Sequence, residues 1–365
     1  MSGPKRVVPF EVHRRLIVAA FKKRGYDDRE SNDFATICDS ATRHGITSHN
    51  GLKALHLDTL FGIKKGGCHP GATIEKLDCR FTTAEVWDAH LKAGPSIAYE
   101  AIAQAERLAE QHGIASIAVD NAWHYLWGGG YVLQSAERGF IAFTQCTAMK
   151  AEVAPYGGQR PSMGTNPHSW ALPTQESIGF PILVDWATSA IAMGRVQQLQ
   201  REGKNLPSNA ALDTRGQLTR DPAKVAALLP FGAHKGYGLG LINEVIAGFI
   251  GGSSPTLRGQ FPGDDEKHAC CYQFIVIHPD ALSAGRYAGK RSRKDNLKVI
   301  IEDIRQGANK DALLPGEREF RAQQLSEQQG GLFFSEAEIT AFTAIAREIE
   351  FADWVPDQFP LASIG

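Results

Sequence analysis

Neither sign of charge dominates this chain of 365 residues, which has 39 lysines and arginines, 40 aspartates and glutamates, and a net charge of −1. Balanced charge argues against a nucleic-acid or anionic-membrane surface. No apolar run reaches the roughly 18 residues that a membrane helix needs, and the N-terminus has no secretory apolar segment. The sequence therefore predicts a cytoplasmic protein of two or three domains, with no nucleic-acid or membrane partner.

Cysteine is also scarce, and the standard site motifs are missing. The six cysteines are scattered without a C-x-x-C pair, which predicts reduced core thiols. The segment CHPGATIEKLDC, residues 68–79, lacks the usual zinc spacing, so no metal site is predicted. No G-x-G-x-x-G opens a helix after a strand, and there is neither a phosphate loop nor a G-x-S-x-G elbow. The usual Rossmann and hydrolase signatures therefore do not apply.

Hydrophobic periodicity predicts a mixed α/β chain. The first third is predicted to be helical, with helices over residues 11–25, 29–45 and 95–113. Four β-rich segments follow, at 114–121, 139–148, 181–189 and 270–279. A helix at 190–203 and a polar stretch at 204–222 interrupt them, and a capping box at Ser335 and Glu338 begins the last helix. The chain ends are expected to pack together around a discontinuous central domain.

Four stretches contain more polar and glycine residues than a structural role requires: RHGITSHNGLKAL (43–55), VDNAWHYLWGGGY (119–131), VAPYGGQRPSMGTNP (153–167) and LPFGAHKGYGLGLINEVIAG (229–248). In the first, Ser48 is expected to cap a helix. In the last, His234 and Lys235 precede a glycine-rich helix start. Exposed amides and a lysine there could hold an anion such as a pyrophosphate. The alternative is close helix packing through the glycines.

Together these stretches resemble the malate/L-lactate dehydrogenases of the second type, which lack the Rossmann fold. Relatives include ureidoglycolate dehydrogenase, diketogulonate reductase and piperideine-carboxylate reductase. The motifs SH, VAPYGG, GTNP, DWATS, HKGYGLGL and LPGERE occur in family order. The resemblance implies a homodimer and an α/β (α+β) fold. Its helical catalytic domain would comprise residues 1–112 and 279–365, its largely antiparallel NAD(P)-binding sheet domain 113–190 and 223–278, and a small helical insertion 191–222.

The resemblance also implies catalytic roles. His49 corresponds to the family histidine that gives a proton when a carbonyl or imine carbon takes hydride. An imidazole with a pKa near 6.5 suits that task. Ser48 would orient the substrate oxygen, or only cap the helix. His124 matches a histidine assigned as a catalytic base. Asp185 would support an imidazolium as a nearby carboxylate, or cap a turn together with Thr188 or Ser189.

Substrate contacts are expected from Lys53, Arg43 and Trp123. Lys53 replaces a common family arginine and supplies charge without the bidentate fork. Asn50 replaces the usual glycine, and both departures put the substrate in doubt. The bulky Trp123 and its aromatic neighbours would wall a pocket for a larger substrate, or simply belong to the core.

Cofactor contacts carried over from the family are more numerous. They are Thr165, Asn166, Asp185, Ala187, Thr188, His234, Lys235, Gly316 and Glu317. P-G-E is also an ordinary turn, so the placement of Glu317 rests on the resemblance alone. The sequence does not separate NAD from NADP.

The predicted function is an NAD(P)H-dependent oxidoreductase that interconverts a 2-oxo acid and a 2-hydroxy acid, with a small-molecule acid as substrate. One alternative is a reductase of a cyclic imine carboxylate or keto sugar acid. Another is a family member that binds a nucleotide or small acid without turnover. A hydrolase built on Ser48 is disfavoured, because adjacent Ser and His on one helix are expected to point apart.

Overall fold

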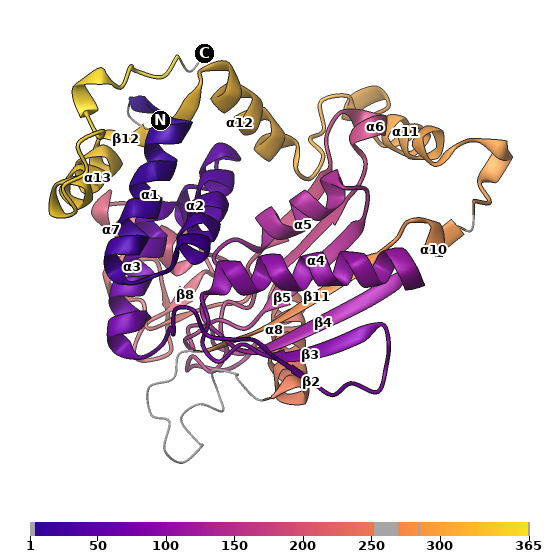
Figure 1. Ribbon diagram of the computed structural model, residues 1–365, viewed down its shortest axis with the longest axis horizontal. Helices are drawn as coiled ribbons and strands as arrows, with labels where there is room; N and C mark the ends of the chain where they lie inside the picture. The colour runs from indigo at the N-terminus through magenta and orange to yellow at the C-terminus, as the bar shows by residue number, and fades with distance from the viewer. Residues whose placement is uncertain (1–3, 252–268, 284, 364–365) are drawn as a thin grey trace.

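The largest layer of the computed structural model is a seven-stranded sheet (Figure 1). The structure describes residues 4–251, 269–283 and 285–363. Only β3 and β4 pair in parallel, and the other neighbours are antiparallel. In spatial order the strands are β2 (Glu75–Leu77), β3 (Ala84–Asp88), β4 (Ile114–Ala122), β11 (Cys270–Ile277), β5 (Ile141–Cys146), β6 (His168–Leu172) and β7 (Ile182–Trp186).

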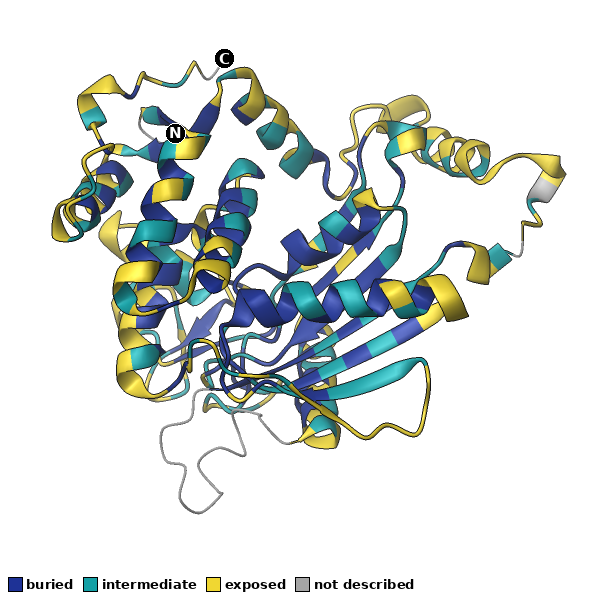
Figure 2. Cartoon of the chain, viewed as in Figure 1, coloured by how far each residue is buried: buried dark blue, intermediate teal, exposed yellow. Residues whose placement is uncertain are grey.

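Three helices pack on this sheet. Helices α4 (Gly94–His112) and α5 (Gly128–Glu137) lie across the face toward the viewer in Figure 1. Pro95 stands in the first turn of α4 and Gly113 ends it, as predicted. Helix α8 (His234–Ile250) contacts β4 and β11. The strands and the sheet-facing sides of α4 and α5 are largely buried (Figure 2).

Both chain ends meet in a second, helical unit. Strand β1 (Lys5–Pro9) pairs antiparallel with β12 (Gly331–Ser335). Around this ribbon pack α1 (Phe10–Arg24), α2 (Asp28–Arg43), α3 (Gly51–Phe61) and α13 (Glu336–Glu348). The capping box of Ser335 and Glu338 begins α13 as predicted. The first and last described segments accordingly lie side by side, and the N–H of Ala362 donates to the Lys5 carbonyl at 2.8 Å. Figure 1 shows the helical unit that they share.

Smaller elements complete the chain. Helix α7 (Met193–Arg201) packs near a three-stranded sheet of β10 (Ala227–Leu228), β8 (Ala211–Leu212) and β9 (Leu218–Thr219), over a core of its own. The other helices are α6 (Gln175–Ile178), α10 (Asp280–Ser283), α11 (Arg293–Ile304) and α12 (Glu317–Gln328). The six cysteines are free thiols, and Cys79 is exposed rather than in the core as expected. None of the described helices is long and apolar enough to cross a membrane.

The mixed α/β fold is confirmed, with two differences. The sheet also takes in β2 and β3, from a region predicted to be helical. These strands are short and β2 is fully exposed. Their sequences therefore lack the alternation of apolar and polar residues from which a strand is predicted. Helix α3 begins at Gly51, and its cap is Asn50, not Ser48. The domain boundaries stay a prediction.

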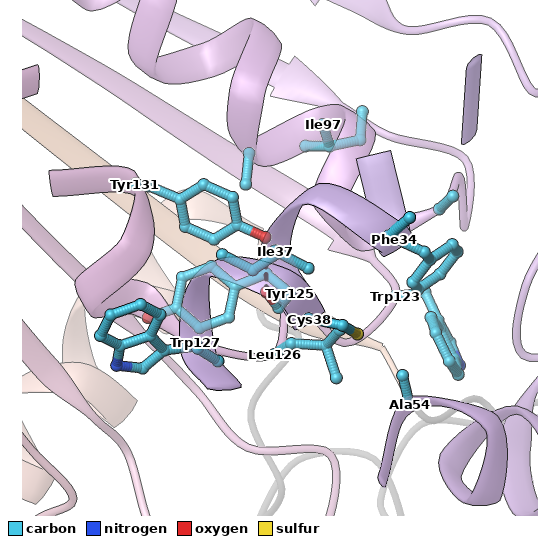
Figure 3. Packing of buried hydrophobic residues seen from close by; sticks show 14 of the residues in the cluster. Phe34, Ile37, Cys38, Ala54, Ile97, Trp123, Tyr125, Leu126, Trp127 and Tyr131 are labelled. Carbon is cyan, nitrogen blue, oxygen red and sulfur yellow. Dashed lines mark hydrogen bonds between the residues drawn. The ribbon is translucent and has the colours of Figure 1, made fainter. Parts of the chain in front are cut away.

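An aromatic cluster joins the helical unit to the sheet (Figure 3). Trp123 packs edge-on against Phe34, at 5.8 Å between ring centroids, and its indole N–H donates to the Phe61 carbonyl. Tyr125 and Trp127 are equally buried. Trp123 belongs to the core, whereas Tyr125 and Trp127 also line the cavity described next. That these aromatics wall a pocket for a larger substrate stays a prediction.

Candidate active site

The turn that holds His49 is fixed from behind by Asn50. A short 3-10 turn, Thr47–His49, joins α2 to α3. Asn50 Oδ1 accepts the backbone N–H of Lys53 at 3.2 Å, and Asn50 Nδ2 donates to Glu338 Oε1 at 2.9 Å. Asn50 is buried, and both ends of its side-chain amide are hydrogen-bonded. Asparagine in place of the usual family glycine therefore adds two hydrogen bonds that hold this turn.

A cavity of about 420 Å³ opens between this turn, the ends of the sheet strands and α7. It brings together seven of the residues predicted for the site, from stretches far apart in the sequence. They are Ser48, His49, Lys53, His124, Thr165, Asp185 and Ala187. The fold therefore gathers the catalytic candidates, one substrate candidate and part of the cofactor set around one space.

His49 and His124 both face this cavity with Nδ1 engaged. Ser48 Oγ lies 2.9 Å from His49 Nδ1, and the backbone N–H of Leu126 donates to His124 Nδ1 at 2.8 Å. An acceptor Nδ1 leaves the proton of a neutral imidazole on Nε2. The Leu126 contact therefore fixes the tautomer of His124, and a hydrogen bond donated by Ser48 does the same for His49.

Burial changes the charge expected for both imidazoles. Desolvation, and then the positive charge of Lys53, lower the pKa of His49 to about 4. Desolvation, then His49 and Lys53, lower the pKa of His124 to about 3. The pKa near 6.5 expected for His49 from the sequence is therefore too high, because burial penalises the imidazolium. Both histidines are neutral at pH 7.

The contact between Ser48 and His49 also corrects the geometric argument against a hydrolase. Adjacent Ser and His side chains were expected to point apart, yet they meet at 2.9 Å. The reason is that the 3-10 turn precedes α3, so helical side-chain directions do not apply to it. Geometry alone does not exclude a serine nucleophile here.

Asp185 lies at the end of β7 and faces the cavity without meeting an imidazole. Its carboxylate accepts from Ser169 Oγ at 2.6 Å and from the Trp127 indole N–H at 3.1 Å. Desolvation raises its pKa, against the effect of these two donors. Asp185 is exposed to the cavity space. It therefore anchors the wall that Trp127 forms, and it makes no hydrogen bond to His49 or His124 in the part of the chain that the structure describes.

The other eight predicted residues do not line this cavity, and Arg43, Trp123, Asn166 and Thr188 are the first four of them. Arg43 stacks on the Phe10 ring at 4.2 Å and lies near Glu327, away from the cavity. Trp123 is core, as described. Asn166 is fully buried, where it accepts the Ala148 N–H and donates to Glu244.

Thr188 is also buried. Its hydroxyl donates to the Thr165 carbonyl at 3.0 Å, and Thr165 itself lines the cavity. Asn166 and Thr188 therefore hold the wall in place.

The P-G-E segment lies on the other side of β7. Gly316, at φ 87°, lines a smaller cavity of about 260 Å³, which shares Asp185 and Trp127 with the larger one. Glu317 is buried and pairs with Arg305 and Arg321. Gly316 therefore faces space beside the site, whereas Glu317 is held by its own ion pairs.

The start of α8 packs against the D-W-A-T-S segment. His234 and Lys235 are exposed in its first turn. A Cβ on Gly236 would lie 2.7 Å from the Thr188 carbonyl oxygen, so only glycine allows this approach. Ala233, just before the helix, holds a strained φ of 56°. The N–H groups of Lys235 and Gly236 are already bonded to the Gly232 and Phe231 carbonyls, so this geometry favours close packing, and an anion-binding helix start stays a prediction.

Among the cavity residues missed from the sequence are one imidazole and two charged side chains: His56, Lys150 and Glu152. His56 lies one turn after Lys53 on α3. Lys150 and Glu152 directly precede the VAPYGG motif, and that adjacency was the available signal. Among the described residues, no group of three or more His, Cys, Asp or Glu could hold a metal ion.

Comparison with known proteins agrees with the resemblance read from the motifs. The malate/L-lactate dehydrogenase family model matches residues 8–342. A Delta(1)-pyrroline-2-carboxylate/Delta(1)-piperideine-2-carboxylate reductase of Pseudomonas putida is 31% identical over 334 residues, which are 88% of this chain and 92% of that protein. A malate/(S)-sulfolactate dehydrogenase of Methanothermus fervidus is 27% identical, over 89% and 93% of the two chains.

Solved structures show the same fold. The delta1-piperideine-2-carboxylate reductase of Pseudomonas syringae pvar. tomato matches with a TM-score of 0.79 and 27% identity, over 93% of this chain and 99% of that chain. The sulfolactate dehydrogenase of Methanocaldococcus jannaschii matches with a TM-score of 0.78 and 25% identity, over 95% and 98%. These relatives are dehydrogenases and reductases of small acids.

Proposed function

Because this chain belongs to the malate/L-lactate dehydrogenase family, a family of dehydrogenases and reductases, we propose that it interconverts a 2-oxo acid and a 2-hydroxy acid with NAD(P)H. The supporting observation is the cavity of about 420 Å³ that His49, His124 and Lys53 share. It offers a proton-transferring imidazole and a cation for a carboxylate in one desolvated space, which is what this reaction requires.

The residues around the cavity fit a nicotinamide dinucleotide. Thr165, Ala187 and Asp185 would line the nicotinamide half, with Gly316 on the far side of β7. His234 and Lys235 at the start of α8 would meet the phosphates. When bound, the reduced nicotinamide supplies the hydride, and the protein supplies position and electrostatics. NADH and NADPH remain equal candidates.

The chain's own part in the reaction follows from the site's hydrogen bonds. Lys53 holds the substrate carboxylate, and His49 Nε2 exchanges a proton with the substrate oxygen. Ser48 keeps His49 Nδ1 engaged, so that Nε2 is the reactive nitrogen. In the oxidation direction the neutral imidazole takes the hydroxyl proton. In reduction His49 must first be protonated, and a bound carboxylate anion favours that charged form.

The experiment that tests this function is absorbance at 340 nm with purified protein, NADH or NADPH, and a panel of 2-oxo acids, keto sugar acids and cyclic imine carboxylates. Oxidation of one cofactor with one group of substrates would support the reaction and choose the cofactor. If both cofactors bind but neither is oxidised with any substrate of the panel, the result would favour a family member that binds a nucleotide or small acid without turnover.

His49→Ala is the decisive variant. We expect it to fold, to bind cofactor and to lose about 10²- to 10⁴-fold in turnover, the usual size of a general acid–base contribution. His112→Ala, at the exposed end of α4, is the control and should turn over like the wild type. Wild-type turnover in His49→Ala would remove His49 from the mechanism.

We further propose a cytoplasmic homodimer. Two exposed apolar helix faces support the dimer. Leu241, Ile242, Val245 and Phe249 form one on α8, and Val299, Ile300 and Ile304 form the other on α11. The cytoplasmic location rests on the sequence expectation alone.

A further inference from the structure

Two opposite charges, those of Lys53 and Glu152, face the cavity without forming an ion pair with each other in the described part of the chain. Lys53 and Glu152 are both half-buried, and both line it. Within the described part of the chain, neither head group has a hydrogen bond or an ion pair, although each affects the other's pKa. Burial lowers the pKa of Lys53 and raises that of Glu152, and the opposite charge counteracts each shift. The cavity therefore presents one cation and one anion to its contents.

Both residues stand on fixed backbone. The N–H of Glu152 donates to the Met163 carbonyl at 2.8 Å, and its carbonyl accepts the Leu228 N–H at 2.8 Å. Asn50 holds the N–H of Lys53. Because both backbones are held, only side-chain motion could bring the ammonium of Lys53 and the carboxylate of Glu152 into an ion pair. We therefore expect a bound molecule to contact both charges.

Lys150 is the other charge that acts on Glu152. It is exposed at the cavity and lies over the Phe61 ring at 5.6 Å. Its charge is a smaller influence on Glu152 than either desolvation or Lys53. Because Lys150 stays in contact with water, it screens Glu152 without neutralising it.

We propose that Glu152 is a specificity-determining residue of the proposed NAD(P)H-dependent site, and that Lys53 and Glu152 together favour a zwitterionic substrate over the 2-oxo acid of the proposed function: a 2-imino acid whose nitrogen is protonated. Lys53 takes the carboxylate, and Glu152 accepts from the iminium N–H. A simple 2-oxo acid would leave the Glu152 carboxylate unpaired, which is costly in a desolvated site. A dicarboxylate would place a second anion beside it.

The reaction balances with NAD(P)H as reductant. The imine carbon takes up the hydride, and the C=N π electron pair becomes the nitrogen lone pair. A proton from His49 then gives the ammonium of the product amino acid. Glu152 lies opposite positive charge at the start and at the end, so it supports binding of both substrate and product.

Glu152→Gln tests this with three substrates: 1-piperideine-2-carboxylate, pyruvate and oxaloacetate. We expect kcat/KM for the imine to fall about tenfold or more, mainly through KM, because a charge-assisted hydrogen bond is lost. The value for pyruvate should rise, because the costly unpaired carboxylate is removed, and the value for oxaloacetate should rise further as repulsion is removed. Glu152→Asp, which keeps the charge, should recover part of the imine activity.

Binding of the products supplies a readout independent of turnover. By calorimetry, Glu152→Gln should weaken binding of L-pipecolate and should not weaken binding of L-lactate. An equal fall for all three substrates, or an unshifted ratio between imine and pyruvate, would overturn the role of Glu152. Failure of the wild type to oxidise NADH or NADPH with any substrate would instead overturn the proposed function on which this inference rests.

Discussion

His49 is placed in an environment that favours its neutral form. Desolvation by burial, and then the positive charge of Lys53, both oppose protonation of the imidazole and lower its pKa to about 4. A lowered histidine pKa means that the imidazole is neutral above about pH 4 and charged only below it. In the proposed reaction, the free enzyme would accept a proton at neutral pH, and the reduction direction would depend on a minor protonated fraction of His49.

That minor fraction predicts the pH profile. For a 2-oxo acid such as pyruvate, kcat/KM of reduction should fall about tenfold per pH unit between about pH 5 and about pH 8, because kcat/KM reports the free enzyme. For oxidation of a 2-hydroxy acid, kcat/KM should be flat over the same range. Initial rates at 340 nm measure both. A bend near pH 6.5 in either direction would contradict the lowered pKa.

At the scale of elements, α3 shows how a helix cap can serve a site. Asn50 caps α3 and also binds Glu338, whose other carboxylate oxygen belongs to the capping box of α13. The turn with His49 is thus tied to a helix almost 290 residues away. A glycine at this position would supply neither hydrogen bond, so the turn that carries His49 depends on the C-terminal helix of this chain.

The start of α8 offers a matched pair of glycines. In Gly236→Ala, the new Cβ would lie 2.5 Å from the Phe231 oxygen and 2.7 Å from the Thr188 oxygen, so we expect a loss of about 1–3 kcal/mol in the free energy of unfolding. It should also weaken NAD(P)H binding. Gly238→Ala meets nothing within 4 Å and should be neutral or stabilise by up to about 1 kcal/mol. Urea unfolding and cofactor fluorescence titration measure both quantities, and equal behaviour of the two variants would contradict the packing argument.

At the scale of the whole molecule, the segment with α10 and α11 extends away from the body (Figure 1). None of the residues of α11 is buried, although Val299, Ile300 and Ile304 are apolar. Helix α11 packs against the short helix α6, and a helix of 12 residues depends on tertiary packing for its stability. A partner chain that covers this face would explain why it is apolar.

The dimer is tested by mass in solution. Light scattering with size exclusion should give twice the chain mass of 39.7 kDa for the wild type. Ile300→Asp should shift the equilibrium toward monomer, because it places a charge in the apolar face. Lys298→Gln, at an exposed polar position of the same helix, is the control and should remain dimeric. A wild type at the mass of one chain would contradict the proposal.

What the sequence determined by itself is local or motif-based. Periodicity and capping rules found α4 and α13 with their ends, because Pro95, Gly113 and the Ser335–Glu338 box act within a few residues. Ordered motifs identified the family, and the structure then brought His49, Lys53, His124 and Asp185 to one cavity.

Only the tertiary structure decided the charge and partners of these groups. The neutral state of His49 and the bonds of Asp185 to Ser169 and Trp127 arise from contacts between distant segments. Glu152 faces Lys53 across about one hundred residues of sequence only because the sheet brings the two together. Desolvation depends on what the whole fold places around a group, and a sequence pattern does not carry that information.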